Sequence, residues 1–208
     1  VSLLDKNGVL KGIIPSNPQI IGKSFAYRDY YQGVSKGWSP YVSEAFVSVI
    51  PPKHNIITVS IPIQSINHEI LGILVFAVKL DAIVGWSKNM EVGQGGLVYI
   101  VDKKGQLVAH RNLKPEDGLV DYSPVATVQK LLRGEYGVET TFNSIDKEEY
   151  LTAYAPVKDY GFGITVAQDI HTAFAQRTRK TLNLSIIWAF IVFVVGLSLL
   201  GNSWLHAF

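Results

Sequence analysis

A hairpin pattern occurs twice in this sequence and limits the folds that the chain can adopt. Residues 2–10 read SLLDKNGVL and residues 99–107 read YIVDKKGQL, each an apolar run, an Asp-Lys-x-Gly turn and a second apolar run. Asp and Gly suit a tight turn because the carboxylate caps backbone N–H groups and glycine accepts a positive φ. Two longer hairpins follow, in the same order, at residues 59–78 and 151–170. The shared order and similar spacing predict a duplicated unit.

Each unit therefore opens with a short hairpin, passes through a mixed middle and closes with a long hairpin. This order predicts an α+β fold with two tandem modules, each built on a central antiparallel sheet. In the second unit, residues 124–134 read PVATVQKLLRG, which is typical of a short amphipathic helix with a glycine stop. We expect the following division: a first module over residues 1–80, a connecting helix over 81–94, a second module over 95–170 and a helical stalk over 171–181.

The C-terminal end of the chain is apolar enough to cross a membrane. Residues 181–208 contain no Asp, Glu, Lys or Arg, and residues 182–200 read LNLSIIWAFIVFVVGLSLL. At about 1.5 Å per residue, this run reaches across a hydrocarbon layer of roughly 30 Å. We therefore expect a transmembrane helix over residues 182–203. A buried core helix is the alternative, but such helices are usually shorter and keep a polar face.

The charges around this span do not indicate its orientation. Arg177, Arg179 and Lys180 precede the span and no charge follows it. This is the opposite of the positive-inside expectation for modules that lie outside the cytoplasm, although charges on a folded, translocated domain weigh little. The chain opens on a strand-like segment without an export signal, so we expect that an N-terminal piece is missing.

Composition excludes several classes of function. The chain has no cysteine, which rules out disulfides, thiolate metal sites and cysteine nucleophiles. A net charge of +2 without a concentrated basic face gives no case for nucleic acid binding. No nucleophile elbow, Ser-His-Asp order or phosphate loop is present, so we expect neither an enzyme nor a cofactor. The histidines lack metal-ligand spacing, so no metal site is expected; they are His54, His68, His110, His171 and His206.

Arg28 is the first candidate for binding a small molecule. Its guanidinium offers five donors in a planar fork that matches a carboxylate. Aromatic residues that can form the wall of such a site are close in sequence: Tyr27, Tyr30, Tyr31, Trp38 and Tyr41. The residues alone leave a second interpretation open, in which Arg28 pairs with Asp29 or another acid and the tyrosines belong to the core.

Five segments of the chain together match the pattern of a known family. They are SFAYRDYY (24–31), PYVS (40–43), SIPIQ (60–64), GILVFAVKLDAI (72–83) and GGLVYIVDKKGQLVAH (95–110). In this order they resemble the double Cache family, whose two PAS-like modules form the extracytoplasmic sensors of bacterial and archaeal chemoreceptors, histidine kinases and diguanylate cyclases. The resemblance implies modules outside the cytoplasm, anchored in the inner or plasma membrane. It also implies that the first module is membrane-distal and binds the ligand.

The resemblance assigns candidate ligand contacts residue by residue. Arg28, Tyr30, Tyr31 and Tyr41 match positions that contact the ligand in amino-acid-binding members of the family. The remaining candidates match the position after PYV or strands that face the family's pocket; they are Ser43, His54, Ser60 and Gln64. In the second module, the resemblance gives Tyr99 and His110 a structural role.

Two departures from the family pattern bear on the ligand. Amino-acid-binding members hold the ligand's ammonium with two acidic residues, and this chain has Ser43 and Ala77 at those positions. A buried ammonium without a counter-charge costs several kcal/mol. We therefore expect a carboxylate without an amine, with an amino acid disfavoured and a neutral or cyclic ligand still open.

The resemblance also implies a signalling mechanism and leaves one alternative role open. It implies a sensor that binds a small molecule, passes a helix shift through the membrane to a cytoplasmic output region, and forms a homodimer through an N-terminal helix. A structural or protein-interaction module with an empty pocket is the alternative, because the family includes such members.

Overall fold

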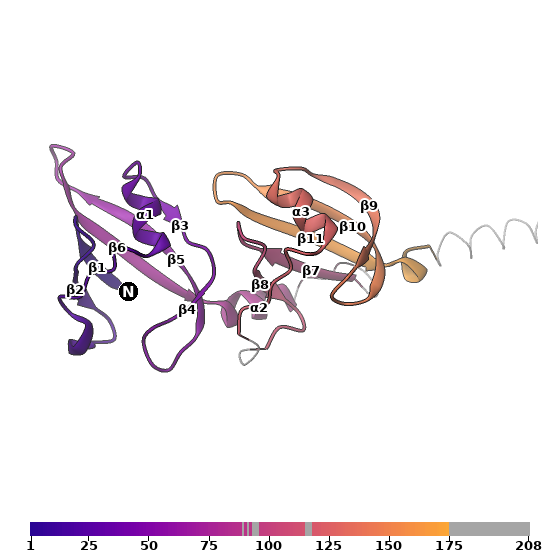
Figure 1. Ribbon diagram of the computed structural model, residues 1–208, viewed down its shortest axis with the longest axis horizontal. Coiled ribbons are helices and arrows are strands. Elements are labelled where there is room, and N and C mark those ends of the chain that lie inside the picture. The colour runs from indigo at the N-terminus through magenta and orange to yellow at the C-terminus, as the bar shows by residue number, and fades with distance from the viewer. Residues whose placement is uncertain (89, 91, 93–95, 115–117, 175–208) are drawn as a thin grey trace, which may run out of the picture.

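The computed structural model of the chain describes residues 1–88, 90, 92, 96–114 and 118–174. Two antiparallel sheets follow each other along the long axis, and a short helix lies against one face of each (Figure 1). The expected α+β class with two antiparallel sheets is therefore confirmed. We refer to the sheet of residues 2–79 and its helix as the first module, and to the sheet of residues 96–169 and its helix as the second module.

The first sheet has the strand order β2-β1-β6-β5-β3, and β4 pairs with β5 beside β3. Its long hairpin keeps an antiparallel register from Ile56 opposite Lys79 to Ile63 opposite Gly72. The elements are β1 (Ser2–Asp5), β2 (Leu10–Ile13), the 3-10 helix η1 (Pro18–Ile20), α1 (Asp29–Ser35), β3 (Tyr41–Val42), β4 (Phe46–Val47), β5 (Asn55–Gln64) and β6 (Ile70–Lys79).

The second sheet repeats this plan with the order β8-β7-β11-β10-β9. The helix expected over residues 124–134 is present as α3 (Ala126–Leu132), and Gly134 beyond its end has a positive φ of 79°. The strands are β7 (Gly96–Val101), β8 (Leu107–His110), β9 (Gly137–Asn143), β10 (Glu148–Val157) and β11 (Phe162–Asp169). The order of strands confirms the duplication that the sequence predicts.

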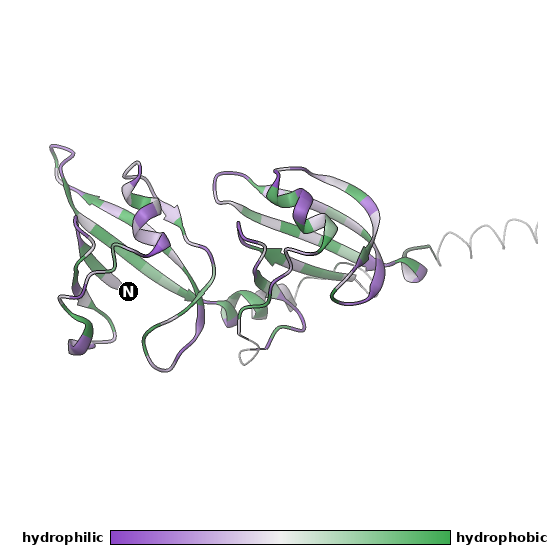
Figure 2. Ribbon diagram, in the orientation of Figure 1, coloured by the Kyte–Doolittle hydropathy of each residue, from purple (hydrophilic) through white to green (hydrophobic). Residues whose placement is uncertain are grey.

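Successive side chains of each strand point to opposite faces of the sheet. In β5, Ile56, Thr58 and Ser60 are buried on one face of the sheet, while the last residue, Gln64, is exposed. The apolar positions run along the strands and the polar ones gather at the turns (Figure 2). Because α1 covers the buried face, its residues Tyr30 and Val34 pack into the core of the first module.

The repeated Asp turns have the same hydrogen bonds in both modules. Asp5 Oδ1 accepts from the backbone N–H groups of Asn7 and Val9, each at 2.9 Å. Asp102 Oδ1 accepts from those of Lys104 and Gln106 at the same distance. The hairpin prediction is therefore confirmed together with its physical reason, which is the side-chain cap.

The second carboxylate oxygen has a different partner in each of the two turns. Asp5 Oδ2 pairs with Lys11 at 3.1 Å on the surface of the first module. Asp102 Oδ2 accepts from the backbone N–H of Ala45 at 2.8 Å, and thus joins the second module to the first. An apolar cluster continues this contact through Ala45, Leu80 and Val108. The modules therefore share part of their core.

Helix α2 (Leu80–Lys88) leads from β6 of the first module toward β7 of the second. It starts one residue before the connecting helix expected over residues 81–94, and residues 89, 91 and 93–95 lie outside the described part of the chain. After β11, residues 170–174 are helical. The rest of the expected stalk and the span expected over 182–203 also lie outside the described residues. Within the described residues, no helix combines the length and apolarity needed to cross a membrane.

The core of the second module contains a histidine. His110 is 4% exposed, and its ring lies 5.9 Å from that of Tyr122 and 6.2 Å from that of Tyr99. Its Nδ1 accepts from the backbone N–H of Asn112 at 3.1 Å, so the proton of the neutral ring sits on Nε2, which has no hydrogen-bond partner among the described residues. Burial, aided by Arg111 and opposed by Asp146, lowers the pKa of His110 from its ordinary value of 6.5.

This lowered pKa predicts a stability that depends on pH. Below pH 6.5 the unfolded chain binds a proton at His110 more readily than the folded chain does, so the free energy of unfolding falls as the pH decreases. Urea unfolding of the full chain between pH 7.5 and about pH 5 measures this slope. We expect His110→Gln to flatten the profile. The control, His68→Asn in the exposed β5–β6 turn, keeps the wild-type slope, and an equal effect of both variants contradicts the prediction.

The two Asp turns predict unequal losses of stability. Asp102→Ala leaves one buried and two partly buried backbone donors without their acceptor and should lower the free energy of unfolding by about 3 kcal/mol. Asp5→Ala removes the same turn bonds from a more exposed site and should cost clearly less. Urea unfolding followed by circular dichroism compares the two variants. Equal losses would show that the bond to Ala45 adds nothing to stability.

Candidate ligand site

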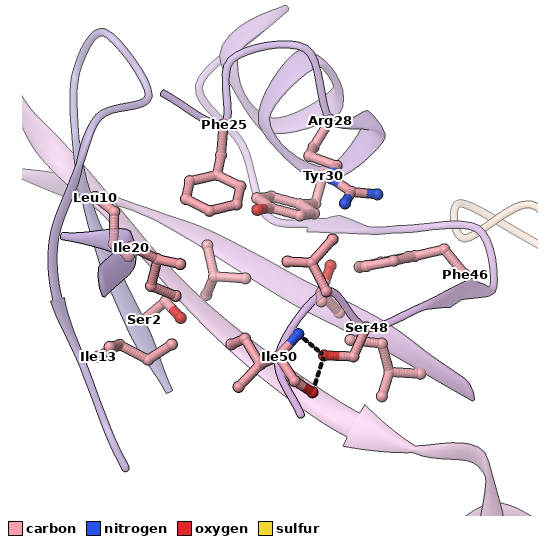
Figure 3. A pocket seen from close by; sticks show the side chains of 15 residues that line it. Ser2, Leu10, Ile13, Ile20, Phe25, Arg28, Tyr30, Phe46, Ser48 and Ile50 are labelled. Carbon is pink, nitrogen blue, oxygen red and sulfur yellow. Dashed lines mark hydrogen bonds between the residues drawn. The ribbon is translucent and has the colours of Figure 1, made fainter. Parts of the chain in front are cut away.

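A cavity of about 80 Å³ lies in the first module between α1 and the buried face of the sheet. Figure 3 shows its walls, with Arg28 and Tyr30 on the helix side and Ser2 on β1. Most of the wall is apolar, formed by Leu10, Ile13, Ile20, Phe25, Phe46, Val49, Ile50, Ile56, Val75 and Ala77. No Asp or Glu is among the described residues that line it. The cavity therefore combines an apolar interior with one cationic group.

Arg28 is the N-cap residue of α1 and lies at the rim of this cavity. Its guanidinium carbon is 5.1 Å from the ring centre of Tyr27 and 5.3 Å from that of Phe46. These distances are typical of cation–π contacts, which orient the planar group without using its N–H donors. Within the described residues, Arg28 has no carboxylate partner. Its donors are therefore available to an anion.

The alternative interpretation of Arg28 required a pair with Asp29, and the structure places Asp29 elsewhere. The two carboxylate oxygens of Asp29 lie 3.0 and 3.1 Å from Nζ of Lys103, a residue of the second module. Oδ1 also accepts from the Tyr41 hydroxyl at 2.8 Å, and Oδ2 accepts from the backbone N–H of Glu44 at 2.9 Å. Asp29 is thus occupied on both oxygens.

Tyr30 packs beside Arg28, with its ring 6.0 Å from that of Phe46. Burial raises the pKa of Tyr30 to about 12, although the neighbouring Arg28 acts against this rise. The hydroxyl is therefore protonated at neutral pH and makes no hydrogen bond with another described residue. It can serve a ligand as a donor.

The floor of the cavity carries a second polar feature. Thr58 lines it from β5, opposite Ala77 of β6. The Thr58 hydroxyl is buried and has no hydrogen-bond partner among the described residues, and the same holds for Ser60 two residues further along the same face. Buried hydroxyls are normally paired, so such a group beside a cavity indicates a place for a polar ligand atom or a water molecule.

The other candidate residues on α1 and on or beside the strands of the first module do not line this cavity. The Tyr31 hydroxyl donates to the Lys6 carbonyl at 2.8 Å. Ser43 is buried, and its hydroxyl donates to the Glu44 carbonyl and accepts from the Thr58 backbone N–H, both at 2.8 Å. Neither residue lines the cavity, and the same holds for Tyr41, Ser60 and the exposed Gln64. Whether they contact a ligand stays a prediction.

His54 lies in an adjoining hollow of about 420 Å³. This hollow shares six wall residues with the cavity: Ser2, Ile13, Ser48, Ile50, Ile56 and Ala77. Lys79 and Asn17 also line it. The site thus has a narrow cationic end at Arg28 and a wider end toward His54.

Three features of this site were not identified from the sequence. Phe46 could not be distinguished from an ordinary core residue. Thr58 had a usable signal, because alternation places it on the same strand face as Ser60. The sequence contained no signal for the pair of Asp29 with Lys103, because this pair joins residues 74 positions apart in different modules.

Comparisons with known proteins agree with this architecture. A family model of the Cache domain matches residues 1–177. A domain described as the extracellular part of a histidine kinase, rpHK1S-Z16, is 20% identical with a TM-score of 0.65, over 83% of this chain and 71% of that one. The ligand-binding domain of the Pseudomonas aeruginosa amino acid chemoreceptor PctB, solved with L-Gln, is 13% identical with a TM-score of 0.63, over 88% and 74%.

A third structure is the periplasmic sensory domain of the Campylobacter jejuni chemoreceptor Tlp1, at 16% identity and a TM-score of 0.57. The match covers 76% of this chain and 62%, less than two thirds, of that domain. Identities this low show a shared fold. No curated protein matches the chain in sequence. Because the family match extends over most of the chain and both sheets have the corresponding order, the chain belongs to the double Cache family of sensor domains.

Proposed function

We propose that the chain is the extracytoplasmic sensor region of a transmembrane receptor and binds a small carboxylate in the cavity of the first module. The observation that carries this proposal is the guanidinium of Arg28 at the rim of an apolar cavity, without a carboxylate partner among the described residues, while Asp29 is held by Lys103. A carboxylate can accept two parallel N–H bonds from such a group. Cache domains are sensory, non-catalytic modules, so this region is not itself an enzyme.

The cavity favours a carboxylate that lacks an amine. Tyr30 and Thr58 offer hydroxyl groups, and the rest of the wall suits a short apolar body. An α-amino acid would bring an ammonium into a cavity whose described walls contain no carboxylate, and the nearby Asp29 is already bound to Lys103. Leaving that charge unpaired costs several kcal/mol. PctB was solved with L-Gln, so this chain would differ from that relative in its ligand.

The signal would travel through the second module to the membrane. In this proposal the first module is membrane-distal and the second is membrane-proximal. The helix that starts at residue 170 continues as a stalk into a span at residues 182–203, in the inner or plasma membrane. Shifts of an ångström or two in such helices are sufficient to bias a bistable output region. A homodimer would place two stalks side by side.

Thermal unfolding of the full chain in a mild detergent tests the ligand class. A ligand that binds only the folded state, at about a hundred times its dissociation constant, stabilises by roughly 2.7 kcal/mol. We expect acetate, propionate or butyrate to raise the melting temperature, and alanine and glutamine to leave it unchanged. Stabilisation by the amino acids instead would contradict the argument from Ser43 and Ala77. No shift with any compound would favour the ligand-free interaction module.

Substitution of Arg28 tests the clamp itself. Arg28→Ala removes a charged hydrogen-bond partner and should weaken binding of the effective carboxylate roughly ten- to a hundredfold. Arg28→Lys keeps the charge without the planar fork and should give an intermediate loss. The control is Lys36→Ala, an exposed cation beside α1, which should change affinity by less than about twofold. Isothermal titration calorimetry measures all three, and unchanged affinity in Arg28→Ala would exclude Arg28 as the clamp.

A further inference from the structure

The turn between β7 and β8 of the second module lies against the first module. We call residues 102–104 of this turn the inter-module turn. Asp102 accepts from the Ala45 backbone N–H at 2.8 Å, Lys103 reaches both oxygens of Asp29, and Lys104 lies 2.9 Å from the Glu44 carboxylate. Three consecutive residues of one module thus bind three positions of the other.

The contacts of the inter-module turn are immediate neighbours of the cavity wall. Asp29 follows Arg28 in the chain, and Ala45 precedes Phe46, whose ring lies against the Arg28 guanidinium. Lys103 Nζ also lies 4.3 Å from the ring centre of Tyr41, which donates to Asp29. The second module therefore binds the residues that adjoin Arg28 and Phe46 in the chain.

The charges at this place depend on Lys103. The neighbouring side chains Arg28 and Asp29 carry opposite charges. By themselves they have no net charge and attract an anion in the cavity only weakly. Lys103 restores one net positive charge and occupies both oxygens of Asp29 at 3.0 and 3.1 Å. Both groups of this pair are partly shielded from water, with side-chain exposures of 31% and 26%, so the pair is less screened than a fully exposed one.

We propose that Lys103 is a positioning residue for the ligand site of the other module: by holding Asp29, it leaves Arg28 free to bind an anion. Without Lys103, the Asp29 carboxylate competes for the neighbouring guanidinium and repels an incoming anion. The predicted effect of Lys103 on ligand affinity rests on the proposed carboxylate function. The predicted effect of Lys103 on the accessibility of Arg28 does not depend on that function. By linkage, a ligand whose affinity depends on this inter-module pair must strengthen the pair by the same factor.

The first experiment measures propionate affinity by calorimetry on the full chain in detergent. Lys103→Gln should weaken binding roughly three- to tenfold, as expected for the loss of one charge several ångströms from the ligand. Lys104→Gln is the matched control. It removes the same charge from the same turn, but at a more exposed side chain that pairs with Glu44, and should change affinity by less than about twofold.

A double variant separates positioning from a merely structural role. In the Lys103→Gln chain, the further change Asp29→Asn removes the competing carboxylate and should restore affinity to near the wild-type value. Lys103→Arg should retain most of the affinity, because it keeps the cation that faces Asp29. If Asp29→Asn gives no recovery, or if Lys104→Gln weakens binding as much as Lys103→Gln does, the inference is wrong.

The second experiment needs no ligand. Methylglyoxal modifies accessible guanidinium groups, and mass spectrometry of the peptide containing Arg28 gives its rate of modification. We expect Lys103→Gln to slow this rate several-fold, Lys104→Gln to leave it unchanged and Asp29→Asn to restore it. Equal rates in all variants overturn the inference. A slowed rate together with no binding of propionate by the wild-type chain would support the role of Lys103 and reject propionate as the ligand.

Discussion

The carboxylate of Asp102 is the contact on which the arrangement of the two modules depends. One oxygen closes the β7–β8 turn, as Asp5 closes the corresponding turn of the first module, and the other binds the Ala45 backbone. Asp102 is 1% exposed and its bond to the Ala45 N–H is buried, so water cannot easily replace the carboxylate at that donor. A local turn motif thus gains a long-range role because its second oxygen remains unused by the turn.

The charges at the cavity of the first module depend on Lys103, the residue that follows Asp102 in the same turn. An arginine without an acidic partner is costly in an apolar setting, and here the cost is limited because the group lies at the rim, between the rings of Tyr27 and Phe46. Asp29 would be its natural partner, but it is bound by Lys103. The second module is therefore more than a spacer, since it controls which charges face the cavity of the first.

The duplication allows the two modules to be compared position by position. The N-cap residue of α1 is Arg28, and that of α3 is Val125, which is fully buried in the core of the second module. The rings of Tyr99, His110 and Tyr122 pack together beneath α3. The same strand order thus supports a cavity with the Arg28 guanidinium in the first module and a cluster of aromatic rings in the second. The two modules therefore differ in the side chains that they place beneath the helix, although their sheets have the same strand order.

Alternation, turn chemistry and helix stop signals are local properties, so the hairpins, a helix within residues 124–134 and the α+β class could be predicted from the sequence, whereas the role of Arg28 stays a prediction. The sequence did not determine that Tyr41 would bind Asp29 or that Ser43 would bridge two backbone groups. The pair of Lys103 with Asp29 likewise becomes visible only in the folded chain. Those contacts join residues far apart in the chain, and their geometry follows from how the sheets, helices and modules pack rather than from any local pattern.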